Sequence, residues 1–543
     1  MKNYINILFL LLIVLPICYS CEDFFEVKSE EVLLEKDYLG DNKFDARSAL
    51  FGILSQMQDL SKEYIVLNEL RADLMDVTDA AIDELRQISE HNVNTENSYA
   101  NPVKFFSIIN NCNIALHGID TSSVYSKEEL LKIYVSILRV RTWTYLQIAI
   151  NYGSVPYITK PISSAANLSA NYPLLTFNQA IDSLINSLLI YSEVDNIDIY
   201  ANSLGFSIYN LIPDKDILLG DLYLWANNYT EAATLYKQFL DRNVSGGGHK
   251  YNLTARFNVT FTLSSGIYRI SNTNWKDIFQ DAIQNDELIM YIPYTKQYRQ
   301  PNDSYDELIT GYQVKPSAEI IKNWTHQYRI FNNIIFDSID TRAELSYNGT
   351  SALPVISKYK HDYMILNRAA NVYLKYAEAI NRAGYPLHAL YVLNSGVKDM
   401  PETPGTPRFT GNMESYLNFE QSKYYTVSST GVATGGNLGI RGRVGMAPLL
   451  VENSINLYDS IQNLELLILN ESALETAFEG NRWSNLIRIA QRNNNPAILA
   501  DAVSNKFSQA GSPLATSIRS KLLDKENWYL NLEVESNFVP VIK

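Results

Sequence analysis

The segment from Leu464 to Arg492 constrains the fold of this 543-residue chain more than any other stretch of its sequence. Its apolar residues recur at spacings of seven and four, which predicts one buried stripe along a helix; they are Leu467, Leu474 and Phe478. Gly480 is expected to end that helix. Acidic residues occupy the early turns of the segment and arginines the late ones, an order that the helix macrodipole favours. The pattern therefore predicts a packed helical hairpin.

Two acids in this segment predict a nearby cation. Glu475 and Glu479 are four residues apart, a spacing at which like charges on a helix repel each other. We expect a cation such as Arg482 to pair with one of them. A packed hairpin with such an ion pair accounts for these side chains without any ligand.

The motif ESALETAFEGNRW, residues 471–483, resembles the E-x-A-x-E-x-A-F-E-G-x-R-W signature of the SusD/RagB family of outer-membrane nutrient-binding lipoproteins. In that family the segment is structural, so the resemblance implies a scaffold and leaves the ligand site open. LRVRTWTYLQIAINYGSVP (residues 138–156) and NVYLKYAEAINRAGYPLHALYVLN (residues 371–394) resemble two further elements of the family. The chain departs from the family pattern at Val140, where Ala is usual, and at YLNLEVESN near its end. The resemblance covers nearly all of residues 21–530.

The spacing of small and aromatic residues predicts tetratricopeptide-like helix pairs. Between Asp214 and Asp241, Gly220 is followed twelve residues later by Ala232, and Tyr236 comes four residues after that. The same frame recurs between Asn371 and Lys398, at Ala377, Ile380, Ala389 and Leu393. Apolar periodicity predicts further helices over Phe44–Leu60, Lys104–Ile119, Lys127–Asn151 and Phe177–Tyr191. The predicted fold is mostly α, a tetratricopeptide-like helical bundle with long irregular loops and minor β structure.

Two long segments do not fit regular helices. Gly246–Thr310 alternates apolar residues with the period of a strand at Phe257, Val259, Phe261 and Leu263. Met400–Pro448 is rich in Pro, Gly, Ser and Thr, and such segments inside a compact chain are often functional loops. The expected organisation is a SusD-like domain over residues 41–543, with a helical part (about 41–245), a loop-rich middle (about 246–365) and a C-terminal part (about 366–530).

The N-terminus predicts a lipoprotein signal. Lys2 precedes an apolar run of 13 residues, shorter than the roughly 20 that span a bilayer. Small Ser20 precedes Cys21, so residues 1–20 are expected to be removed and Cys21 to carry lipid. Residues 21–40 form an acidic tether that resembles the family's surface-export signal. Cys18 leaves with the signal, so no intramolecular disulfide is possible and Cys112 stays free in the mature chain.

Charge and motifs exclude several classes of function. The net charge of -14 repels nucleic acid phosphates, so no nucleic acid partner is expected. The sequence contains no zinc spacing, P-loop, dinucleotide fingerprint or nucleophile elbow, and we predict no catalytic residue, metal or cofactor. Asp73 and Asp76 form an acid pair of the kind glycosidases use, but a helix rich in acids supplies such pairs by chance.

The resemblance implies a cell-surface lipoprotein on the outer membrane that binds an oligosaccharide and delivers it to a SusC-like TonB-dependent transporter. In the family the tetratricopeptide-like helices face the transporter barrel, which makes Asp214–Asp241 a candidate docking surface. Two alternatives remain open. In the first, the protein belongs to the same family but binds a peptide or another nutrient in place of a sugar. In the second, the chain is a tetratricopeptide scaffold or an enzyme.

A sugar offers an apolar face and a rim of hydroxyl groups, so its site needs aromatic rings and planar polar side chains. The irregular middle region supplies aromatic candidates in or beside it: Tyr268, Trp275, Tyr298 and Trp324. An early position from which family members often reach their pocket supplies the polar candidates Arg71, Asp73 and Asp76. By contrast, Trp143, Trp225 and Trp483 lie on helical stripes and are expected in the core.

Overall fold

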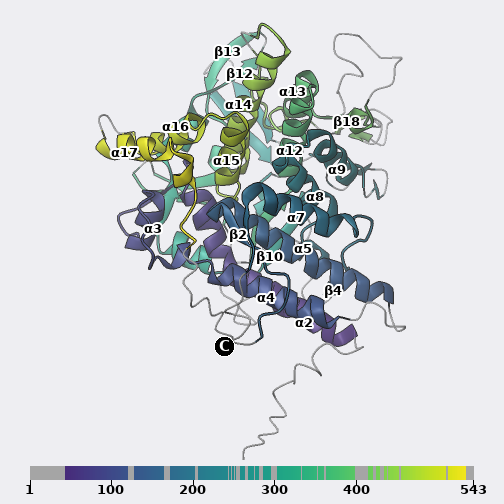
Figure 1. Ribbon diagram of the computed structural model, residues 1–543. Helices are drawn as coiled ribbons and strands as arrows, with labels where there is room; N and C mark the ends of the chain where they lie inside the picture. The colour runs from purple at the N-terminus through teal and green to yellow at the C-terminus, as the bar shows by residue number, and fades with distance from the viewer. Residues whose placement is uncertain are drawn as a thin grey trace, which may run out of the picture.

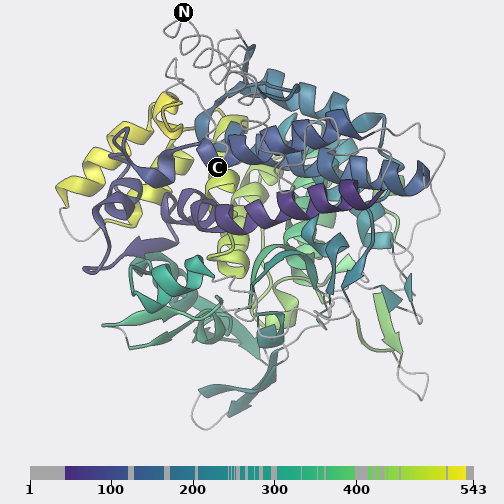
Figure 2. The same cartoon turned by 90° about the horizontal axis from the view of Figure 1, so that it is seen from below.

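The N-terminal helices form as their apolar periodicity predicts. The computed structural model describes residues 43–532, apart from 120–126, 164–171, 202–205, 263–266, 280–284, 295–301, 398–413, 428–432 and shorter breaks elsewhere. The four predicted helices are α2 (Lys43–Ile65), α4 (Val103–Gly118), α5 (Lys127–Tyr152) and α7 (Phe177–Leu189), and the short helix α3 (Asp83–Ser89) was not predicted. In Figure 2, α2 runs across the molecule beside α4 and α5, while most of the short strand pairs lie along one edge. Within the described residues no helix has the length and apolarity to cross a membrane.

The expected tetratricopeptide-like pairs are confirmed. The first pair is α8 (Lys215–Trp225) and α9 (Tyr229–Asp241), and the second is α12 (Ala369–Arg382) and α13 (Pro386–Asn394). Gly220 lets α9 approach α8 closely, because a Cβ there would lie 2.9 Å from the ring of Tyr236. Ala232, Ala377 and Ala389 are fully buried between the helices. The two pairs share one hydrophobic core, since α12 also packs on α9.

The helical hairpin at the signature lies at the centre of the molecule. It consists of α14 (Leu457–Thr476) and α15 (Arg482–Arg492), and Figure 1 shows it between α12–α13 and the last helices, α16 (Ala497–Asn505) and α17 (Pro513–Leu522). Leu474 and Phe478 are buried, as the stripe predicts, and Leu467 is half-buried.

The expected end of the first helix at Gly480 is wrong by four residues. The helix α14 ends at Thr476, and Phe478 and Gly480 both have positive φ angles, 72° and 79°. The carboxylate of Glu69 explains the early ending, since it accepts hydrogen bonds from the backbone N–H groups of Phe478, Asn481 and Arg482. These N–H groups therefore have a partner outside the helix.

The β structure is minor, and within the described residues every sheet has two antiparallel strands. The longest pairs are β8 (Phe257–Thr262) with β9 (Ile267–Thr273) and β10 (Leu288–Pro293) with β16 (Tyr363–Arg368). The strand predicted around Phe257 is thus confirmed. Other pairs are β1 (Met75–Val77) with β11 (Val314–Pro316), β2 (Ser154–Pro156) with β3 (Leu174–Thr176), β12 (Gln327–Phe331) with β13 (Ile334–Ser338), and β14 (Tyr347–Gly349) with β15 (Pro354–Ile356).

The fold class is as expected, mostly α with tetratricopeptide-like pairs and minor β. The signal segment, Cys21 and the tether lie outside the described residues, as does much of Met400–Pro448. The division into three parts stays a prediction. Cys112 is a buried free cysteine on α4, and burial raises the pKa of its thiol to about 12.

Candidate functional site

Two of the polar residues predicted to bind ligand are buried and already paired. The guanidinium of Arg71 donates to Asn151 Oδ1 (3.2 Å) and to the carbonyl oxygen of Trp528 (2.7 Å). Arg482 donates to both carboxylate oxygens of Asp73, at 2.6 and 2.8 Å. Arg71 and Asp73 are each 2% exposed, which contradicts a ligand-contact role. They join the first helices to the C-terminal ones.

The third polar candidate, Asp76, makes its contacts within a pair of short strands. Asp76 is half-buried on β1, lies opposite Lys315 of β11 in the strand register, and accepts a hydrogen bond from the backbone N–H of Val77 (2.8 Å). Its carboxylate therefore has a local structural role at the strand.

The predicted aromatic platforms Trp275 and Trp324 are also core residues, and both are fully buried. The indole N–H of Trp275 donates to Glu475 Oε1 (3.4 Å), and that of Trp324 donates to the carbonyl oxygen of Leu474 (3.2 Å). Because α14 supplies an acceptor for each indole, both rings can be buried without losing a hydrogen bond. Neither ring has a face left for a sugar. Tyr298 and the side chain of Tyr268 lie outside the described residues.

The signature acids sit in a buried ion-pair network. Glu475 accepts from Arg342 (3.0 Å), Arg368 (2.8 Å) and Arg443, and Glu479 accepts from Lys358 (2.7 Å) and Arg368 (2.8 Å). Cations therefore pair with both acids, as expected, but the cation named as an example, Arg482, pairs with Asp73 instead. Burial alone would raise the pKa of Glu475, but the guanidinium groups of Arg443, Arg368 and Arg342 hold it well below its usual range.

The network as a whole is balanced in charge. Its ten members, linked by ion pairs, are the cations Lys358, Arg342, Arg368, Arg441 and Arg443 and the anions Glu287, Asp340, Glu471, Glu475 and Glu479. We call this set the charge network. Each of these side chains is at most 4% exposed. The network therefore holds α14 to the middle region and offers no open face to a ligand.

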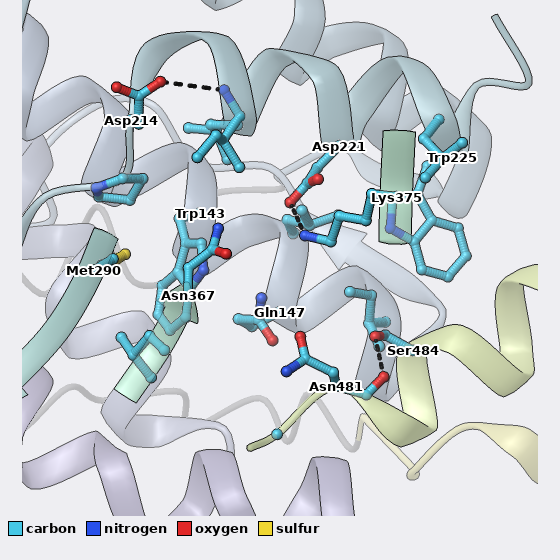
Figure 3. Close-up of a pocket in the computed structure, with 18 of the residues that line it drawn as sticks. Trp143, Gln147, Asp214, Asp221, Trp225, Met290, Asn367, Lys375, Asn481 and Ser484 are labelled. Carbon is cyan, nitrogen blue, oxygen red and sulfur yellow. Dashed lines mark hydrogen bonds and ion pairs between the residues drawn. The ribbon is translucent and has the colours of Figure 1, made fainter. Parts of the chain in front are cut away.

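A small, partly open cavity lies between α5, α8, α12 and α15 (Figure 3). Its polar lining includes Gln147, Asn367 and Asn481, and the ion pair between Lys375 Nζ and Asp221 Oδ2 (2.7 Å) crosses one side. Its volume is about 70 Å³. Ligand pockets usually measure roughly 300–1,000 Å³, whereas a water molecule occupies about 30 Å³ of liquid. The cavity suits a few water molecules and excludes a sugar.

An open groove of about 500 Å³ is large enough for a ligand. Four separate segments build it: the start of α7, the α8–α9 turn, the end of α15 and the short helix η11 (Lys525–Trp528). We call it the α7–α15 groove, and its lining residues are Thr176, Phe177, Asn178, Trp225, Asn227, Tyr229, Arg488, Gln491, Arg492 and Lys525. The groove is the candidate functional site.

Local structure fixes the walls of the α7–α15 groove. A capping box between Thr176 and Gln179 begins α7 and sets the position of Phe177, whose ring lies 5.0 Å from that of Trp225. Asn227 has a positive φ of 59°, a conformation that Asn adopts more readily than most residues, and this turns the chain from α8 into α9. Trp225 is only 7% exposed, so the core role predicted for it is confirmed although its edge reaches the groove.

None of the lining residues was among the predicted site residues. The segments that meet here are up to about 350 positions apart, as Thr176 and Lys525 show, and one sequence gives no sign that they meet. The available local signal was the pair Asn227 and Tyr229, a polar residue and an aromatic in a helix–helix turn.

No family model matches the chain. SusD-like protein P38 of Formosa agariphila is 23% identical to it over 540 residues, which cover 90% of this chain and 91% of that protein. Among solved structures, a SusD superfamily protein from Bacteroides vulgatus ATCC 8482 matches with a TM-score of 0.60 and 13% identity, covering 90% of this chain and 95% of that one.

A SusD-like carbohydrate binding protein from Bacteroides fragilis NCTC 9343 matches with a TM-score of 0.55 and 13% identity, over 87% of this chain and 90% of that one. At this identity the solved structures establish a common fold. The chain is thus similar to a SusD-like protein along 90% of its sequence, and it shares the fold of SusD superfamily structures.

Proposed function

We propose that this protein is a cell-surface lipoprotein of the outer membrane that binds a carbohydrate nutrient and delivers it to a SusC-like TonB-dependent transporter. The observation that carries the proposal is the similarity to a SusD-like protein over 90% of the chain. Solved relatives of the same fold include proteins described as carbohydrate binding. The proposal contains no catalytic step.

The α7–α15 groove supports a binding role in chemical terms. Half-buried Phe177 and Tyr229 offer ring surface for the apolar face of a sugar, and exposed Asn178 and Asn227 offer amides for its hydroxyl groups. Its volume of about 500 Å³ lies within the usual range for small-molecule sites. A saccharide is therefore a better match for the groove than an extended apolar ligand.

The purified mature protein is expected to bind saccharides on a glycan array and to release no shortened product from the saccharides it binds. Reducing-end assays on the same saccharides measure cleavage. Binding to peptides in place of glycans would keep the family role and replace the ligand class. Turnover of a bound saccharide would contradict the proposal outright.

Replacing Cys21 by serine is expected to abolish acyl labelling and to release the protein from the outer-membrane fraction. Each methylene of an acyl chain contributes roughly 0.8 kcal/mol to membrane attachment, and the chain's net charge of -14 adds no attraction to anionic lipids. The matched control is Cys112→Ser, which should keep the acyl label.

The wild-type protein should also co-purify with a TonB-dependent barrel from solubilised outer membrane, with α8 and α9 as the proposed docking surface. Unchanged labelling of the Cys21 variant, or purification that never yields a barrel, would count against the anchor or the partner respectively.

A further inference from the structure

We propose that the α7–α15 groove selects a saccharide that carries a negative charge, a carboxylate or a sulfate. The inference rests on the proposed function for the ligand class, and it adds the charge of that ligand. Three observations about the groove carry it: the charges of its lining, the way those charges are already paired, and the aromatic rings beside them.

The lining of the α7–α15 groove is cationic. It contains Arg488, Arg492 and Lys525, and no carboxylate is among its described lining residues. This is the reverse of the chain as a whole, which carries 59 acidic residues against 45 Lys and Arg. A positive groove on an acidic protein concentrates anions locally and repels them elsewhere.

Two acids behind the groove pair with its arginines. Glu378 accepts from Arg488 (2.7 Å) and Arg492 (2.8 Å), and Glu465 accepts from Arg492 (2.6 Å) and Arg382. The two groove arginines, Arg488 and Arg492, are thus balanced in charge by two buried carboxylates, which also hold them in position.

Lys525 supplies the net positive charge of the groove lining, at the rim. Its ammonium group donates to the neutral amide oxygen of Asn494. Because Asn494 is neutral, the ammonium group can turn toward a ligand without giving up an ion pair at this position. A carboxylate or sulfate on a sugar is the group that would gain most from this position.

Aromatic rings lie directly against these cations. The guanidinium of Arg492 lies 5.0 Å from the centre of the Tyr229 ring, and that of Arg488 lies 5.4 Å from the centre of the Trp225 ring. Ring contact and ion pairing together hold the arginine planes in fixed positions. A charged sugar ring can therefore stack on an aromatic side chain while its anionic group meets a cation beside it.

The test is a calorimetric titration of the full mature protein with four probes. These are a uronic-acid trisaccharide, its carboxyl-reduced neutral counterpart, a sulfated trisaccharide and its desulfated counterpart. At least one anionic probe is expected to bind at least tenfold more tightly than its neutral counterpart, and the anionic probe that binds more tightly identifies the charged group. Raising the salt concentration should reduce that difference.

Lys525→Gln tests the position of the binding site. This variant should bind the preferred anionic probe roughly tenfold more weakly, the loss expected for one charge-assisted hydrogen bond. Lys322→Gln is the matched control: the same change at an exposed lysine of α10 (Ala318–Thr325), outside the groove, should leave affinity unchanged. Equal binding of charged and neutral probes, no binding of either anionic probe, or equal effects of the two variants would overturn the inference. Tight binding of neutral saccharides alone would overturn it and still support the proposed function.

Discussion

Replacing Glu475 by alanine is expected to destabilise the folded protein by about 3–5 kcal/mol, the usual cost of removing one partner from a buried ion pair. Glu475 is fully buried and pairs with Arg342, Arg368 and Arg443. The charge network holds five cations and five anions, so the substitution leaves one buried positive charge without a counterion. The measurement is the free energy of unfolding from denaturant titration at neutral pH.

Two variants separate charge from packing and from general surface effects. Glu475→Gln keeps the size of the side chain and removes its charge, so it should lose most of the same stability. Asp501→Ala breaks the exposed pair with Arg519, in which both side chains are about half exposed, and should cost less than about 1 kcal/mol. A Glu475→Ala variant as stable as Asp501→Ala would contradict the structural role of the charge network.

Replacing Gly480 by alanine is expected to cost about 2–4 kcal/mol. Gly480 has a φ of 79°, and a Cβ there would lie 2.1 Å from the ring of Tyr64, which is itself buried at 6% exposure. The unfavourable backbone conformation contributes roughly 1 kcal/mol and the overpacking roughly 1–3 kcal/mol. The loss should appear as a lower free energy of unfolding in the same denaturant titration.

Two other glycines provide controls for the two contributions. Gly384 also has a positive φ, 99°, but a Cβ there would meet no described heavy atom within 4 Å, so Gly384→Ala should cost about 1 kcal/mol. Gly52 lies in the helix α2 with the same open space, and Gly52→Ala should stabilise the protein by up to about 1 kcal/mol. If Gly480→Ala matched Gly384→Ala, the close contact with Tyr64 would not exist in solution.

Elements with local causes were predictable from the sequence. The periodic helices and both tetratricopeptide-like pairs appear where the spacing of apolar and small residues indicates, because these patterns depend on neighbours within one or two turns. The end of α14 was missed because its turn is fixed by Glu69, about 410 positions earlier in the chain. The residues around Gly480 form no local pattern that would predict a hydrogen bond to Glu69.

The burial of four predicted ligand-binding residues could not be foreseen for a related reason. Trp275 and Trp324 look like exposed platforms because irregular sequence surrounds them, but their hydrogen-bond acceptors lie on α14, 200 and 150 positions away. Arg71 and Asp73 likewise find partners in the C-terminal part. Burial of a polar or aromatic side chain depends on these distant partners. Sequence periodicity indicates only which face of a single helix or strand is apolar.

The central claim, that this protein captures a saccharide in the α7–α15 groove, is tested most directly by a crystal structure of the mature protein with the anionic trisaccharide that it binds most tightly. The account predicts an intact sugar ring stacked beside Tyr229, with its charged group within hydrogen-bond distance of Lys525 or Arg492. An intact saccharide bound elsewhere on the protein would contradict the proposed site, and a cleaved saccharide would contradict the proposed function.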